Sequence, residues 1–236
     1  MNPRTCKLAG IGAFLFFMSA WNEASAQQAL PGAYGSLHHP DGGSMFTGPN
    51  AAASFACGSL AVSGGPSPTL TSTSENCSEF AQAILIYSFS IVGPANAGPI
   101  PVAIASTVTL QTSGGYQAGY SLAVNLENLH VENCLLGLSN AACGTHSFID
   151  LRSFAANTVY SVSMMVLTGP YGSGAGHATL DPVFTIDPLF ASAYSLRFSE
   201  GVMNGVPPPV PEPQTLFLMA TGLLVLAARR RHLQQR

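Results

Sequence analysis

Two adjacent histidines and a nearby carboxylate form the densest polar cluster of the chain, His38-His39-Pro40-Asp41. Imidazole nitrogens and a carboxylate oxygen are ligands that suit transition metals. The cluster lies in a segment rich in glycine and proline, with no second pattern of ligands around it. We therefore expect a solvated loop here, and we predict no metal site and no cofactor.

Asp181 and Asp187 are a second candidate, because two carboxylates six residues apart could supply oxygen ligands to Ca²⁺. Each of them precedes a proline, which favours an extended backbone and marks the end or the edge of a strand. We favour the structural role over the ion site.

Catalytic motifs are absent from the sequence. It contains no G-x-S-x-G, no H-E-x-x-H and no phosphate-binding glycine loop ending in Lys-Ser or Lys-Thr. His130, His146 and His177 are isolated in the sequence. A secreted hydrolase would need convergent carboxylates or a histidine dyad in a pocket, and the candidates for these are Asp150, Asp181, His146 and His177. We predict that the protein is not an enzyme and assign no catalytic residue.

Four cysteines remain once Cys6 is set aside with the N-terminal segment described below: Cys57, Cys77, Cys134 and Cys143. An even number in an exported chain indicates two disulfides, which can connect in three ways. We favour the local pairs, 57 with 77 and 134 with 143, because each pair flanks one loop-like stretch. The spacings do not fit a zinc module, so a metal site is the weaker alternative.

Charge excludes one class of partner. Residues 27–206 contain nine acidic side chains and two basic ones, Arg152 and Arg197, so their net charge is 2 − 9 = −7 before the histidines are counted. Lysine does not occur in this span. Nucleic acids are bound through clustered Lys and Arg, so we predict no nucleic-acid partner.

The elements that would position these residues are strands. Residues 102–111 and 158–167 alternate between apolar and small or polar side chains, which is the period of a half-buried strand. Glycine-rich stretches at 113–115 and 169–176 predict a turn and a loop, and residues 127–144 predict an excursion with a short helical turn.

About eight short strands and no long amphipathic helix predict an all-β fold, an antiparallel β-sandwich that is jelly-roll-like. Residues 27–206 are enough for one such domain.

The N-terminus has the pattern of a secretory signal peptide over residues 1–26. Arg4 and Lys7 precede an apolar run, and Ala24-Ser25-Ala26 is an A-x-A cleavage site. An uncleaved signal anchor is the alternative.

The C-terminus combines three segments within residues 207–236. Five prolines form a spacer up to Pro213, residues 215–228 are uncharged and apolar, and Arg229, Arg230 and Arg231 follow. The apolar run predicts a transmembrane helix, but fourteen helical residues reach only about 21 Å across a bilayer core of about 30 Å. Such a helix is a marginal anchor, with its arginines on the cytoplasmic side.

Pro211-Glu212-Pro213, followed by a short apolar helix and an arginine cluster, resembles the PEP-CTERM sorting signal of Gram-negative bacteria that make extracellular polysaccharide. The resemblance implies that an exosortase recognises the tripeptide, and that the chain is held briefly in the membrane and then reaches the cell surface or extracellular matrix. It also implies an association with exopolysaccharide and biofilm.

We therefore predict an exported, disulfide-linked β-sandwich that is sorted by its tail. One alternative is a carbohydrate-binding module that stacks Tyr116, Tyr120 and Tyr171 on sugar rings. Another is an uncleaved single-pass membrane protein with a periplasmic β domain.

Overall fold

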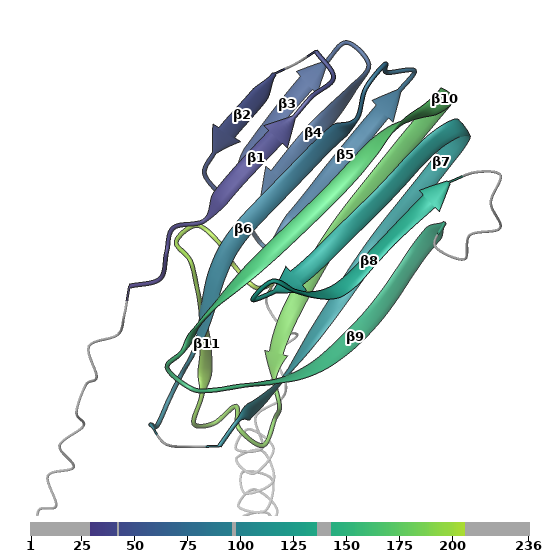
Figure 1. Ribbon diagram of the computed structural model, residues 1–236. Coiled ribbons are helices and arrows are strands. Elements are labelled where there is room, and N and C mark those ends of the chain that lie inside the picture. Colours follow the sequence, from purple (N-terminus) through teal and green to yellow (C-terminus); the bar gives the residue numbers. More distant parts are fainter. Residues whose placement is uncertain (1–28, 42, 96–97, 136–142, 206–236) are drawn as a thin grey trace, which may run out of the picture.

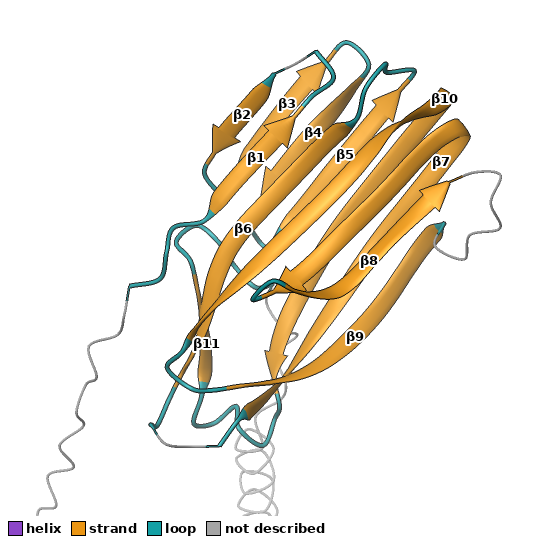
Figure 2. Ribbon diagram, in the orientation of Figure 1, coloured by secondary structure: helices purple, strands orange, loops and turns teal. Residues whose placement is uncertain are grey.

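The computed structural model describes residues 29–205, apart from 42, 96–97 and 136–142. All regular secondary structure in these residues is β-strand (Figure 2). The strands are β1 (Tyr34–His38), β2 (Ser44–Thr47), β3 (Ala51–Phe55), β4 (Gly58–Ser63), β5 (Thr69–Glu75), β6 (Ala81–Val92), β7 (Ile100–Val124), β8 (Glu127–Leu135), β9 (Gly144–Phe154), β10 (Val159–Ile186) and β11 (Ser195–Phe198). The predicted all-β antiparallel class is confirmed.

The predicted signal helix and the predicted transmembrane helix both lie outside the described residues. Within residues 29–205, no helix is long and apolar enough to cross a membrane.

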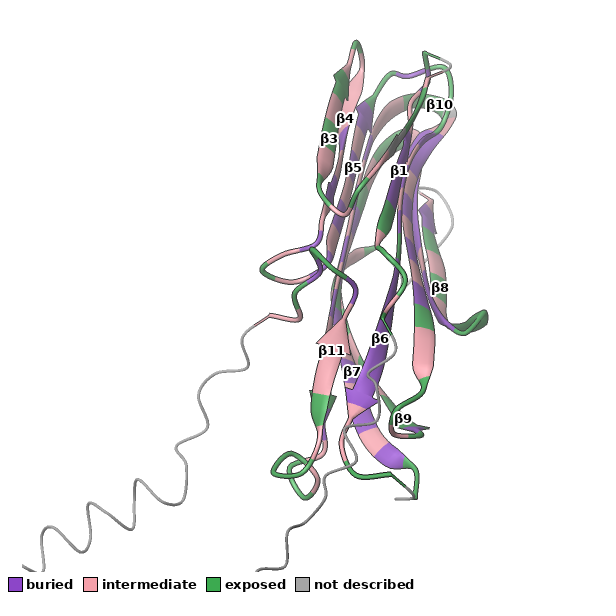
Figure 3. Ribbon diagram, turned by 90° about the vertical axis from the view of Figure 1, so that its left-hand side faces the viewer, coloured by how far each residue is buried: buried purple, intermediate pink, exposed green. Residues whose placement is uncertain are grey.

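One continuous sheet provides both layers of the fold. Its strand order is β2-β1-β6-β10-β5-β4-β3, and β7 pairs with β10, β8 and β9. The long strands β7 and β10 pair from Val162 opposite Val124 to Ile186 opposite Val102. At one end of this pair, β6 pairs with β10 and β8 pairs with β7. At the other end, β5 pairs with β10 and β9 pairs with β7. The sheet curls so that these two halves face each other, as Figures 1 and 3 show.

We call the half that contains β2, β1, β6 and β8 the front layer, and the half that contains β3, β4, β5 and β9 the back layer. Strands β7 and β10 run through both layers. The prediction of many short strands was wrong at this point, because two strands of 25 and 28 residues replace four short ones.

The glycine-rich stretches are the places where the long strands bend without ending. Gly114 has a φ of +61° and lies opposite Gly174, whose φ is +148°, next to a register shift between Pro170 and Gly174. A Cβ atom on Gly114 would collide with the carbonyl oxygen of Ser173, and one on Gly174 with that of Ser113. Glycine therefore permits both the backbone conformation and the close approach of the strands.

Residues 127–144 also differ from their prediction, because the first nine of them form β8. The turn before β8 has two residues with positive φ, Asn125 at +49° and Leu126 at +66°. Two such residues make the tight connection that matches the twist of a β-hairpin. The predicted helical turn does not occur in the described part of this stretch.

The core lies between the two layers, where alternate side chains of each strand point inward. Phe89 of β6 is fully buried, with its ring centroid 5.2 Å from that of Phe154 on β9 and 5.0 Å from that of Phe184 on β10. The aromatic contacts of Phe89 thus join the front layer to the back layer.

Buried hydroxyl groups fix the layers together near the bend. Thr168 Oγ1 lies 2.7 Å from Ser72 Oγ and accepts a hydrogen bond of 2.8 Å from Ser74. Ser72 also donates to the carbonyl oxygen of Ala81 at 3.2 Å. Since an unsatisfied buried hydroxyl is costly, this network specifies how β5 meets β10.

Both predicted local disulfides are confirmed. Cys57 bonds to Cys77 with a Cα–Cα distance of 5.4 Å, and Cys134 bonds to Cys143 with a Cα–Cα distance of 5.0 Å. The first bond links the β3–β4 turn to the end of β5, and the second links the end of β8 to the start of β9.

Tyr87 predicts how stability depends on alkaline pH. Its hydroxyl is buried without a hydrogen-bond partner among the described residues. Burial first, and the charge of Asp181 second, raise the pKa of Tyr87 above its ordinary value. Its contribution to stability is therefore fully present below pH about 10 and is lost as pH rises toward the folded-state pKa.

We expect Tyr87→Phe to leave stability at pH 7 unchanged or slightly higher. Above pH 10 the variant should lose less stability than the parent, by up to about 1.4 kcal/mol per pH unit for one proton. Urea unfolding between pH 7 and 11 measures both slopes. Equal slopes would show that Tyr87 ionises in the folded state as it does in the unfolded one.

Candidate functional site

Serine and threonine side chains lie in register on the outer face of the back layer. The odd-numbered residues of β5, β9 and β10, and of the first half of β7, point outward there. We call the resulting surface the hydroxyl face; its members are Thr69, Thr71, Thr73, Thr107, Thr109, Thr145, Ser147 and Thr179.

One row of the hydroxyl face crosses four neighbouring strands with threonine at every position. Thr71 pairs with Thr179, Thr179 with Thr109, and Thr109 with Thr145. The hydroxyls of Thr109 and Thr145 lie 3.0 Å apart. Neighbouring strands are about 4.8 Å apart, and alternate residues along a strand about 6.6 Å, so the hydroxyls form a two-dimensional array.

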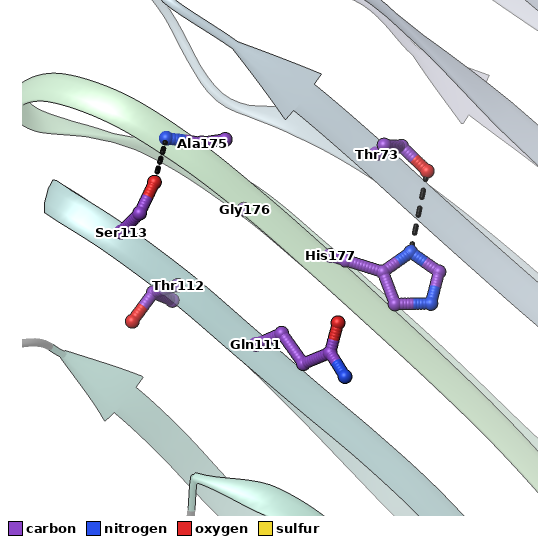
Figure 4. Close-up of a pocket in the computed structure, with 7 residues that line it drawn as sticks. All are labelled: Thr73, Gln111, Thr112, Ser113, Ala175, Gly176 and His177. Carbon is purple, nitrogen blue, oxygen red and sulfur yellow. Dashed lines mark hydrogen bonds between the residues drawn. The ribbon is translucent and has the colours of Figure 1, made fainter.

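A shallow hollow of about 310 Å³ lies where the hydroxyl face approaches the bend. Figure 4 shows His177 of β10 between Thr73 of β5 and Gln111 of β7. Thr73 Oγ1 lies 3.4 Å from His177 Nδ1. At the rim of the hollow, the backbone amide of Ala175 donates to Ser113 Oγ at 3.0 Å.

The face is rich in hydrogen-bonding groups and poor in charge. Asp181, opposite Thr107, is the acidic group within it, and Glu75 lies at its margin. Hydroxyls both donate and accept, so the array suits a neutral ligand that carries repeated hydroxyl groups of its own. It holds no pair of groups placed to activate a nucleophile.

The residues that a hydrolase would need are not brought together. His146 and Asp150 have the inward parity of β9, whereas His177 and Asp181 have the outward parity of β10. Within each pair, four residues of strand separate the two side chains by about 13 Å. No histidine and carboxylate among these four can form a dyad.

The histidine cluster is only in part the predicted solvated loop, because His38 is the last residue of β1 and Pro40 is buried. Its two histidines also have different partners. Hydrogen bonds join His38 Nε2 to Ser36 Oγ at 2.8 Å and His38 Nδ1 to Ser44 Oγ at 2.7 Å. His39 stacks on Phe55 instead, and its Nδ1 lies 4.0 Å from Asp41 Oδ2. The described residues include no group of three metal-ligating side chains.

Asp181 and Asp187 have different roles. Asp187 follows β10 and accepts a hydrogen bond of 2.8 Å from the backbone amide of Leu189, so its predicted structural role is confirmed. Asp181 lies inside β10 and ends no strand, but it lies where one edge of β10 has no partner strand, which is the other position that was predicted for it. Pro182 is tolerated there because β5 pairs with β10 only as far as Leu180, which leaves the edge free of a partner strand.

Two of the three tyrosines considered for sugar stacking are in the core. Tyr116 is 0% exposed and Tyr120 is 2% exposed, so neither presents a ring to a ligand. Tyr116 donates a hydrogen bond of 3.1 Å to the carbonyl oxygen of Cys77. The side chain of Tyr171 lies outside the described part of the chain.

An aromatic contact closes the gap between β8 and β9, and the sequence did not reveal it. The rings of His130 and Phe148 stack with centroids 3.9 Å apart, and Tyr120 Oη lies 3.3 Å from His130 Nδ1. Burial, and then the nearby Glu132 and Asp150, raise the pKa of Tyr120 above its ordinary value. Only the pairing of β7 with both β8 and β9 brings these residues together.

Comparison with known families identifies the tail. The family described as "PEP-CTERM protein-sorting motif" matches residues 209–231. The chain carries a PEP-CTERM sorting motif. The match includes Pro211, Glu212 and Pro213 and extends to Arg231, so the family recognised from the sequence is confirmed. A PEP-CTERM motif indicates export and sorting to the cell surface.

The residues of the PEP-CTERM motif lie outside the described residues, as do the predicted cleavage residues Ala24 and Ala26. No curated protein matches this PEP-CTERM chain. Among solved structures, a PA14 sugar-binding domain from an RTX adhesin aligns over 75% of this chain and 100% of its own, with 15% identity and a TM-score of 0.33. A similarity of that size carries no argument about fold or ligand.

Proposed function

We propose that this chain is an exported, non-enzymatic surface protein that an exosortase processes at its PEP-CTERM tail. The motif at residues 209–231 is the observation that supports the proposal. The signal peptide is cleaved after Ala26, and residues 215–228 hold the chain in the membrane with Arg229–Arg231 on the cytoplasmic side. Removal of the tail then delivers the β domain to the surface or to the extracellular matrix.

The non-enzymatic part of the proposal rests on the separation of the candidate acids and bases. General acid–base catalysis requires a proton donor or acceptor within hydrogen-bond reach of the reacting group, supported by a second group. The back layer does not supply that arrangement, because His146 and Asp150 lie on its inner face and His177 and Asp181 lie on its outer face.

We further propose that the domain contacts extracellular polysaccharide through the hydroxyl face. An extended polysaccharide presents hydroxyl groups at regular intervals, and the aligned threonines offer donors and acceptors at regular intervals. Each contact is weak because water competes for it. Many such contacts along one polymer add up to useful binding through their high effective concentration.

Replacement of two threonines of the row by lysine tests the contact. We expect Thr109→Lys with Thr179→Lys to abolish retention of the protein by exopolysaccharide purified from the producing cells, because two long charged side chains hold a polymer away from the array. Co-sedimentation of the protein with the polysaccharide measures retention.

Ser161→Lys is the matched control, since Ser161 is exposed on the outer face of the front layer, and it should bind as the parent does. Equal retention of all three proteins would disprove the hydroxyl-face contact. It would leave sorting by the tail unaffected, because sorting is read out separately, by processing.

A further inference from the structure

Strand β9 is an exposed sheet edge with large apolar side chains. Within the described residues it pairs with β7 alone, along the whole of Gly144–Phe154. Ile149 is 69% exposed and Leu151 is 77% exposed, and both point outward beside Ala105 and Ala103 of β7. A long regular edge with exposed apolar residues is a template for pairing with another strand.

Several of the usual protections of an edge are missing from β9. Its eleven residues include no lysine and no proline, and its register with β7 is continuous. β8 also pairs with β7 alone, but its pairing is interrupted by a register shift between Leu122 and Ala123 of β7. The remaining edge strands of the described residues, β2, β3 and β11, have only four or five residues, so β9 is the edge best prepared to accept a partner strand.

Two charges on the inward side of β9 are incompletely paired. Asp150 Oδ2 is buried without a hydrogen-bond partner among the described residues. The side chain of Arg152 is 42% exposed, and its Nη1 lies 4.0 Å from Glu127 Oε2, which is a loose ion pair. These opposite charges are two residues apart and share one face of the strand.

We propose that two copies of this chain associate by antiparallel pairing of their β9 strands, centred on Leu151. In this register Asp150 of each copy lies opposite Arg152 of the other, and the two Leu151 side chains meet on the outer face. The contact is symmetric, as in most dimers of identical chains, and opposite charges on facing residues stabilise a strand pair.

Charge selects this register over its neighbours. A pairing centred on Asp150 would place the two carboxylates opposite each other, which is destabilising. A pairing centred on Ile149 would place His146 opposite Arg152 and leave Asp150 opposite Phe148. Of these three registers, only the pairing centred on Leu151 gives both Asp150 residues a basic partner.

Cysteine cross-linking of the full chain, exported by cells, tests the register. The four cysteines of residues 27–206 are paired with each other, so an added cysteine has no partner within its own copy. We expect Leu151→Cys to shift the protein from monomer to disulfide-linked dimer in non-reducing electrophoresis, because directly opposed residues come within disulfide range.

Ile149→Cys is the control on the same strand. In the proposed register its two copies are offset by four residues, about 13 Å, which is too far for a disulfide. Leu189→Cys, at a position 86% exposed in the turn after β10, controls for random collisions. A dimer with Ile149→Cys but not Leu151→Cys, or equal yields from all three variants, would overturn the proposal.

Reversal of charge gives an independent test. In the Leu151→Cys background, Arg152→Asp should reduce the dimer to the level of Leu189→Cys, since carboxylates would then face each other. Asp150→Arg combined with Arg152→Asp should restore it. Undiminished cross-linking with Arg152→Asp alone would overturn the assigned register.

Discussion

Glu212→Ala is expected to leave the C-terminal tail on the exported protein. Glu212 is the charged residue of the tripeptide within the PEP-CTERM motif. In the proposed function, an exosortase recognises that tripeptide before it processes the chain. The variant should accumulate in the membrane at its unprocessed mass. Mass spectrometry of the C-terminus, compared with the parent chain, measures the effect.

Pro208→Ala is the matched control for this substitution. Pro208 belongs to the same proline-rich spacer but precedes the matched residues, so its replacement should leave processing unchanged. A parent chain with the same C-terminus in cells with and without an exosortase would contradict the sorting proposal. It would favour instead an uncleaved single-pass protein.

Phe89→Ala is expected to destabilise the domain by about 4 kcal/mol, because the cavity left by a buried phenylalanine is large. The expected loss is a large share of the roughly 5–15 kcal/mol that a domain has available. Phe89 joins β6 to Phe154 and Phe184 in the back layer, so the cavity would open between the layers. Urea unfolding followed by circular dichroism, with both disulfides intact, measures the change.

Ile86→Ala on the same strand is the control, since Ile86 is 39% exposed. We expect it to cost about 1 kcal/mol or less, as partly exposed side chains bury less apolar surface. If Phe89→Ala lowered the free energy of unfolding by no more than Ile86→Ala does, contact between the layers would contribute little to stability.

Local features of the sequence predicted the local features of the structure. Alternation at residues 102–111 and 158–167 identified the strands, and the proximity of the cysteines in sequence identified the pairs Cys57–Cys77 and Cys134–Cys143. Both signals depend on a few neighbouring residues. The family of the tail was likewise contained in a short contiguous stretch.

Features that depend on register between distant strands were not predictable. Taken separately, Gly114 and Gly174 each predict the end of a strand. The two strands bend there instead, because the two glycines lie opposite each other. Tyr116 and Tyr120 lie at inward positions, but the sequence alternation alone does not say which face is inward.

The hydroxyl face was missed for the same reason. Thr71, Thr109, Thr145 and Thr179 are far apart in the chain, and only strand order aligns them. A candidate signal was present in the spacing Thr69-x-Thr71-x-Thr73 within one strand.

The central place of β10 determines the order in which the protein can fold as it leaves the cell. β6 and β5 each pair with β10 and not with each other. The described strands before residue 159 therefore form three separate groups with open edges: β2-β1-β6, β3-β4-β5, and β7 with β8 and β9. Pairings between strands that are distant in the sequence form slowly, and open sheet edges are prone to aggregation until they are paired. Only residues 187–208 separate β10 from the sorting motif. In the proposed function, the sheet would therefore close at about the moment when the tail reaches the membrane. The membrane-held tail would then keep each new chain at the bilayer while its last long strand is inserted.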